Sequence, residues 1–160
     1  MPPRSANPLR PIRKRFRLLR FDLDPARGCA AAAAFVDHVE HLAVGIGSAR
    51  GLDADQAYFL GVALREAIVN ALRHGLREDG GGRVTVSFRL SSENLLDITV
   101  RDRGCGFDPA GLADPLAAEN IERNCGRGIF YMRRFVDRVS FTFPRCGGAV
   151  VRLGKQLPDA

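Results

Sequence analysis

The chain has 160 residues, of which 46% are hydrophobic, and a formal net charge of +6. This length and composition fit one globular domain with a core of its own. No apolar run approaches the roughly 20 residues that a membrane span needs, and the start lacks the apolar core of a signal peptide. Its four cysteines show no Cys-x-x-Cys spacing, which argues against structural zinc and for free thiols. We therefore expect a cytoplasmic protein with no membrane segment.

The positive charge is concentrated at the N-terminus. Residues 1–20 hold seven Lys or Arg and no acidic residue, which leaves residues 21–160 with 17 basic and 18 acidic side chains. A basic arm of this kind can bind nucleic acid, or it can be a proline-rich, solvated tail. We favour the tail, because no basic and aromatic face continues into the domain. Residues 1–14 are therefore expected to form an arm, and nucleic acid is not the expected partner.

The first elements expected are a strand and a helix. A strand is predicted at 15–23, where Phe and Leu residues recur with one slip in register. A helix is predicted at 25–45, which contains a run of alanines. The glycines of residues 45–51 are expected to stop this helix and to form a turn.

A second helix is expected to begin at a capping box of Asp53 and Gln56 and to run to His74. On this helix Glu66, Asn70 and His74 follow one another at intervals of four residues, so they share one stripe with neighbours about 6 Å apart. An acid and an amide beside an apolar face need polar partners, which makes the stripe a candidate site. The alternative is a solvated stripe without a function.

The second half of the chain is rich in predicted strands. The expected elements are strands at 83–90 and 95–101, a loop at 107–125, a helix at 127–135, and strands at 137–143 and 148–153. Apolar and polar residues alternate in the first two of these strands. The order of elements favours an α+β fold, a two-layer α/β sandwich with helices on one face of a mixed, mostly antiparallel sheet. The domain is expected to span 15–154, followed by a tail at 155–160.

Two glycine-rich segments carry further candidate contacts. Asp102 follows a strand end, and Gly104 and Gly106 let the backbone approach a flat ligand closely. A carboxylate there can accept a hydrogen bond from the exocyclic amine of adenine. Residues 126–128 open a helix, where free amides and the helix dipole attract phosphate. Each segment alone could be an ordinary turn. The chain lacks the Gly-x-x-x-x-Gly-Lys-Ser/Thr loop, so a nucleotide would be bound with another geometry.

Taken together, these segments resemble the Bergerat-type ATP-binding superfamily, which includes gyrase, histidine kinases and bacterial anti-sigma-factor serine kinases. Residues 66–75 (Glu-Ala-Ile-Val-Asn-Ala-Leu-Arg-His-Gly) resemble its N-box, residues 102–108 (Asp-Arg-Gly-Cys-Gly-Phe-Asp) its first glycine box, and residues 126–132 (Gly-Arg-Gly-Ile-Phe-Tyr-Met) its second. Residues 114–120 and 135–139 most resemble the anti-sigma-factor kinase branch. The similarity covers nearly the whole predicted domain.

The resemblance implies a role for each matching residue. Asn70 corresponds to the magnesium-binding amide, Glu66 to the acid that prepares the attacking hydroxyl, and Asp102 to the carboxylate that recognises adenine. Arg123 is expected to reach the terminal phosphate, and residues 107–125 to form a mobile lid. The other implied nucleotide-binding residues are His74, Gly104, Gly106, Gly126, Arg127 and Gly128. The implied cofactors are ATP and Mg²⁺.

The implied function is a serine/threonine kinase that phosphorylates an anti-sigma-factor antagonist and sequesters a sigma factor. The alternative is a partner-binding module in which ATP only shapes a surface. Glu66 favours the kinase, because a pure binding module has no need of that acid. Pairing of two copies is left open. Sensor histidine kinases have a histidine-bearing dimerisation helix before this domain, and because no such helix is recognised here, we do not expect a sensor histidine kinase. Two features depart from the family pattern: residues 146–149 lack its supporting threonine hydroxyl, and the basic N-terminal arm lies outside it. His74 is a frequent N-box residue, but it can equally pack against the helix end.

Overall fold

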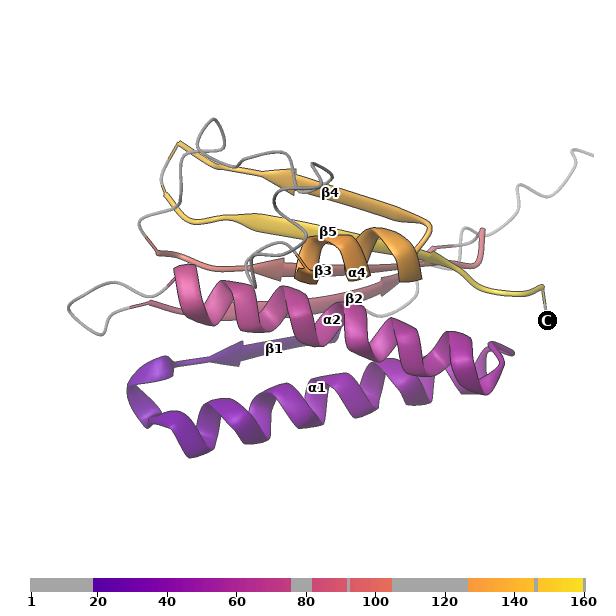
Figure 1. Ribbon diagram of the computed structural model, residues 1–160, viewed down its shortest axis with the longest axis horizontal. Coiled ribbons are helices and arrows are strands. Elements are labelled where there is room, and N and C mark those ends of the chain that lie inside the picture. The colour runs from indigo at the N-terminus through magenta and orange to yellow at the C-terminus, as the bar shows by residue number, and fades with distance from the viewer. Residues whose placement is uncertain (1–18, 76–81, 92, 105–126, 146, 160) are drawn as a thin grey trace, which may run out of the picture.

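A computed structural model describes residues 19–75, 82–91, 93–104, 127–145 and 147–159 of the chain. In this part of the chain, helices lie on one face of a five-stranded sheet (Figure 1). The described elements are β1 (Leu19–Leu23), the short 3-10 helix η1 (Pro25–Arg27), α1 (Cys29–Ala49), α2 (Ala54–His74), β2 (Val84–Leu90), β3 (Leu95–Arg101), α4 (Arg127–Phe135), β4 (Arg138–Thr142) and β5 (Val150–Gln156). The predicted two-layer α+β sandwich is confirmed.

The sheet has the strand order β1-β2-β3-β5-β4, and each pairing among the described strands is antiparallel. Successive side chains of a strand point to opposite faces. One row across the sheet is apolar and packs toward the helices: Phe21, Val86, Val100, Val151 and Phe141. The adjacent row is polar: Arg20, Ser87, Thr99, Arg152 and Ser140. The strands therefore bury one face, as expected for an antiparallel sheet with helices on one side.

Helix α2 lies at the centre of the helical layer and provides most of its core. Its fully buried residues are Leu60, Ala63, Leu64, Ala67 and Ile68. The helix begins at Asp53, whose side chain accepts a hydrogen bond from the backbone N–H of Gln56 at 2.7 Å. The Gln56 side chain accepts the N–H of Asp53 in return at 3.4 Å. The predicted capping box, and a helix that runs to His74, are confirmed.

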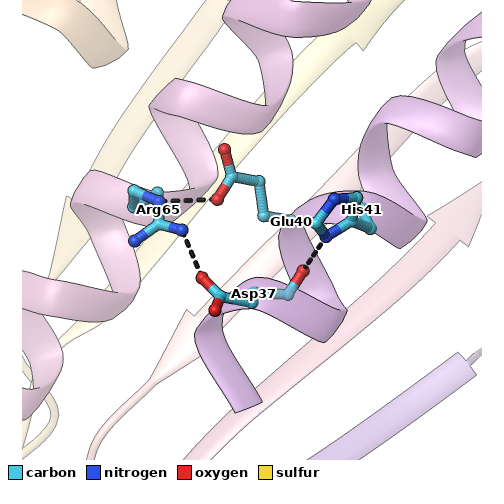
Figure 2. Close-up of polar contacts among 4 residues, drawn as sticks. All are labelled: Asp37, Glu40, His41 and Arg65. Atoms are coloured by element: carbon cyan, nitrogen blue, oxygen red, sulfur yellow. Dashed lines mark hydrogen bonds and ion pairs between the residues drawn. The ribbon is translucent and has the colours of Figure 1, made fainter. Parts of the chain in front are cut away.

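Arg65 joins α2 to α1 (Figure 2). Its Nε lies 2.5 Å from Oε2 of Glu40, and its Nη2 donates to Oδ1 of Asp37. These two hydrogen bonds raise the pKa of the Arg65 guanidinium above its usual value. The two helices also approach closely at Gly61, where an added Cβ would meet Cγ2 of Val44 at 2.8 Å. The hydrogen bonds of Arg65 and the close approach at Gly61 therefore hold α1 against α2.

The predicted end of the first helix is wrong. Residues 45–51 were expected to form a turn, but α1 continues to Ala49. Gly47 has a packing role inside the helix, because an added Cβ would lie 2.9 Å from Cδ1 of Leu52. The chain turns instead at Gly51, whose φ of 88° suits glycine. The glycine at 47 therefore serves helix packing, and the glycine at 51 serves the turn.

The start of this helix also differs from the prediction. Residues 25–27 form η1, and α1 begins only at Cys29, after Gly28 takes a φ of 92°. Before it, β1 is described from Leu19 onward, so the predicted strand residues 15–18 and the arm at 1–14 lie outside the described residues.

The last strand is longer than expected. β5 extends to Gln156, and the side chain of Leu157 is only 1% exposed. Its backbone N–H donates to the carbonyl of Asn94 at 2.9 Å. The folded domain therefore includes residues that were predicted to form a tail at 155–160.

Among the described helices, α1 is long and apolar enough to cross a membrane by length and composition alone. Core helices of soluble proteins pass the same test. Here α1 buries Val36, Val39, Ala43 and Gly47, and it packs along α2 (Figure 1). This criterion is therefore weak evidence for a membrane segment.

Candidate functional site

Glu66 and Asn70 lie one turn apart on α2, and the start of α4 covers them. An added Cβ at Gly128, the second residue of α4, would lie 2.7 Å from Oε2 of Glu66 and 3.2 Å from Nδ2 of Asn70. Both side chains are half-buried. The missing side chain at 128 lets the N-terminal main chain of α4 come against the acid and the amide. The structure therefore brings together three predicted site residues from two distant segments.

Asp102 follows β3 and is the buried charged residue of the described part of the chain, with 5% of its surface exposed. Its Oδ1 accepts hydrogen bonds from the backbone N–H groups of Gly104 and Ala149, each at 3.1 Å. Its own N–H donates to the carbonyl of Ala149 at 3.0 Å. Among the described residues, both bonds to the carboxylate end on Oδ1. The described backbone therefore fixes this carboxylate through Oδ1.

Three glycines from separate segments surround Asp102. An added Cβ at Gly75 would lie 2.4 Å from Cβ of Asp102, and one at Gly148 would lie 2.3 Å from its carbonyl oxygen. An added Cβ at Gly104 would meet the carbonyl oxygen of Gly75 at 2.2 Å. Gly148 also has a φ of 80°, which side-chain-bearing residues rarely adopt. The end of α2, the segment after β3 and the segment before β5 thus converge on one carboxylate.

Sequence reasoning missed Gly75 and Gly148 as site residues. Gly75 was expected to follow the helix end as the last residue of the N-box, and residues 146–149 were interpreted as a place where a supporting hydroxyl is lacking. In the structure the backbone N–H of Ala149 supports Asp102 directly. The signal that could have found this contact is the pair of glycines at the start of an expected strand.

The structure describes the remaining predicted residues only in part. His74 is exposed at the C-terminal end of α2, and Arg127 is the first residue of α4. Gly106, Arg123 and Gly126, with the lid at 107–125, lie outside the described residues. Their assignments therefore stay predictions.

The described residues include no group of three His, Cys, Asp or Glu side chains that could hold a metal ion. A metal at this site would depend on the amide oxygen of Asn70 and on oxygens of a bound nucleotide. Mg²⁺ binds in this way, because it keeps several waters and uses one or two protein ligands together with substrate phosphates. The donor set at Asn70 therefore fits Mg²⁺ that enters with a nucleotide.

A comparison with protein families agrees with this geometry. The model of the histidine kinase-like ATPase domain matches residues 29–155, which is most of the chain. The chain belongs to this family. The ATPase domain therefore uses ATP, as the resemblance implied, and the match includes both glycine boxes and the N-box.

Curated relatives of the ATPase domain lie in one branch of the family. The chain is 34% identical to the anti-sigma F factor of Heyndrickxia coagulans over 95 residues, which are 58% of this chain and 64% of the relative. It is 32% identical to the anti-sigma F factor of Bacillus subtilis over 106 residues, 64% of this chain and 71% of the relative. It is 30% identical to the serine-protein kinase RsbW of Bacillus subtilis over 101 residues, 59% of this chain and 62% of the relative. The predicted branch, that of the anti-sigma-factor kinases, is confirmed.

Solved structures share the fold of the ATPase domain. One holds the RsbU and RsbW domains of Rv1364c from Mycobacterium tuberculosis, with a TM-score of 0.60 and 19% identity over 91% of this chain and 34% of that one. Another is the histidine kinase domain of the blue-light activated histidine kinase EL346 from Erythrobacter litoralis, with a TM-score of 0.55 and 21% identity over 80% of this chain and 60% of that one. At these identities the likeness shows the fold alone.

Proposed function

We propose that this ATPase domain is a cytoplasmic serine/threonine kinase that phosphorylates an anti-sigma-factor antagonist and otherwise sequesters a sigma factor. The names of its relatives, anti-sigma F factor and serine-protein kinase, support the two halves of this proposal. The observation that carries the kinase half is the position of Glu66, which lies with Asn70 against the start of α4.

In this proposal the nucleotide contacts are divided among three residues. Asp102 accepts a hydrogen bond from the adenine amine, Asn70 binds Mg²⁺, and the main chain at Gly128 holds phosphate oxygens at the N-terminus of α4. When bound, Mg²⁺ supplies neutralisation of the charge on the phosphates. Because phosphoryl transfer depends mostly on position and charge, these groups suffice to orient the terminal phosphate.

Glu66 performs the remaining step on the acceptor side. Its carboxylate takes the proton of the attacking serine or threonine hydroxyl as the oxygen bonds to phosphorus. The carboxylate lies one helical turn from the metal-binding amide, so an acceptor hydroxyl at Glu66 is also beside the transferred group.

The test replaces Glu66 with glutamine, which keeps its size but cannot take a proton. We expect Glu66→Gln to lower phosphate transfer from ATP to the antagonist by roughly 10²–10⁴, because ATP still binds and only the base is lost. Single-turnover transfer of labelled phosphate and calorimetric ATP titration measure the two effects. The matched control is Glu93→Gln, the same chemical change on an exposed acid between β2 and β3.

Unchanged transfer by Glu66→Gln would remove Glu66 from the reaction. If the unaltered chain binds ATP and the antagonist but transfers no phosphate, the kinase half fails. The domain is then a partner-binding module in which ATP shapes the binding surface.

A further inference from the structure

Five aromatic rings form one continuous cluster where α4 lies against α2. We call it the aromatic patch, and it consists of Tyr58, Phe59, Phe130, Tyr131 and Phe135. The rings of Phe59 and Phe135 stack across the two helices with centroids 4.2 Å apart, and Tyr131 stacks on Phe135 at 5.6 Å. Edge contacts extend the cluster to Tyr58 on one side and to Phe130 on the other.

Three rings of the aromatic patch are exposed. Tyr58 is 59% exposed, Phe130 48% and Phe59 36%. In the described part of the chain, the other exposed large hydrophobic side chain is Leu19 on β1. Aromatic residues that gather on a surface mark protein contacts, because they bury a large area with little loss of side-chain freedom. The patch therefore has the composition of a docking surface.

Two contacts relate the aromatic patch to the proposed catalytic acid. Gly128 of α4 faces Glu66, and Phe135 of α4 stacks on Phe59 of α2. From Gly128 to Phe135 the chain advances by two helical turns, and from Glu66 to Phe59 it goes back by the same amount. The helices are therefore antiparallel here, and the stacked rings lie about 10 Å from Glu66 along the same line.

The charged residues beside the α4 end of the aromatic patch are positive. Phe130, Arg133 and Arg134 are neighbours on one face of α4, because they are spaced by three and four residues. Both arginines are exposed in the last turn of the helix. An occupant of the patch would thus present apolar side chains together with acidic ones.

We propose that the aromatic patch docks the protein phosphoacceptor, through an apolar surface flanked by acidic side chains that lies next to its reactive serine or threonine. This inference rests on the proposed kinase function. A water molecule or a small alcohol at Glu66 would leave the patch uncovered. A folded protein that places its hydroxyl at Glu66 extends well beyond 10 Å, so its surface reaches the aromatic patch.

The test removes the two outermost rings in a Tyr58→Ala/Phe130→Ala variant, which keeps the stack of Phe59 on Phe135. We expect the KM for the antagonist and its Kd to rise about tenfold or more, as for exposed aromatic anchors of an interface. The maximal rate of transfer, the ATP affinity and the Tm should stay near those of the parent. The matched control is Leu19→Ala, which truncates an exposed apolar residue far from α4 in the chain.

A second variant tests the charge. Arg133→Glu/Arg134→Glu should also raise the KM for the antagonist, and the difference from the parent should shrink as salt is added. Arg152→Glu, a charge reversal at an exposed position of β5, is the control and should leave that KM unchanged.

The outcomes separate this inference from the kinase proposal. The docking site is overturned if the parent transfers phosphate and the aromatic variant has the same KM and Kd for the antagonist. If that variant instead loses sigma-factor binding or self-association, the patch belongs to those occupants. If the parent binds the antagonist without transfer, and the variant loses that binding, docking stands and the kinase half fails. If the parent neither binds nor phosphorylates the antagonist, both fail.

Discussion

Asp102 owes its position to backbone groups. Its Oδ1 is held by the N–H groups of Gly104 and Ala149, and Gly75 and Gly148 pass too close for any side chain. A carboxylate fixed at one oxygen presents the other in a set direction. In the proposed function this acceptor-only group receives the amine of adenine and repels the carbonyl of guanine.

At this residue we expect Asp102→Asn to change nucleotide choice and to preserve the fold. The amide oxygen can keep both backbone hydrogen bonds, while the new NH₂ group replaces the acceptor that faces adenine. ATP binding should weaken by about 2–4 kcal/mol, because two donors then face each other. The same NH₂ group can donate to guanine, so the preference for ATP over GTP should fall.

Calorimetric titration with both nucleotides and a melting curve measure these changes. Arg103→Gln changes an exposed neighbour and serves as the control. Equal losses of ATP and GTP binding, or a collapsed fold, would show that Asp102 supports the structure and does not read the base.

At the scale of elements, helix boundaries were predictable where local signals decide them. Asp53 and Gln56 form a capping box that can be recognised in sequence, and α2 begins and ends as predicted. The end of α1 was not predictable, because Gly47 is explained by a contact with Leu52 that only the packed helices create. The same reason hid the site roles of Gly75 and Gly148, whose neighbour Asp102 comes from a distant segment.

Alanine substitutions at two glycines, Gly45 and Gly61, are expected to change the free energy of unfolding in opposite directions. Gly45→Ala should stabilise the domain by about 0.5–1 kcal/mol, because Gly45 lies inside α1 and an added Cβ meets nothing within 4 Å. Gly61→Ala should destabilise it by about 1–3 kcal/mol, because its Cβ would meet Val44 of α1 at 2.8 Å.

Urea denaturation of the parent and of both variants measures the two free energies of unfolding. If Gly45→Ala destabilises the domain, the result would favour the turn that the sequence predicted for residues 45–51 over the helix. A neutral Gly61→Ala would mean that α1 can move away from α2 at little cost.

At the scale of the whole molecule, the basic arm and the domain are expected to be separable. Deletion of residues 1–14 should leave the Tm within about 2 °C of the parent, since solvated residues add little stability. Phosphate transfer should also survive, because the predicted site residues lie between Glu66 and Gly128. Differential scanning calorimetry and the transfer assay measure both quantities.

A fall in Tm of about 8 °C or more, the loss expected from removing well over 1 kcal/mol of packing, would show that the arm packs on the domain. A slower, less salt-sensitive association with an acidic partner would instead assign the arm to electrostatic steering. Tight DNA binding that persists at high salt would favour the nucleic-acid alternative.

The order of the strands has a consequence for the newly made chain. β5 comes last of the described strands in sequence, yet it lies between β3 and β4. Just before it, Ala149 donates its N–H to the Asp102 carboxylate and accepts the N–H of Asp102 at its carbonyl. During translation Asp102 leaves the ribosome before the groups that will hold it, and the sheet stays divided until β5 arrives. A chain that stalls short of β5 therefore lacks the Ala149 groups that hold Asp102. If Asp102 recognises adenine as proposed, ATP binding stabilises only those chains whose synthesis has passed this strand.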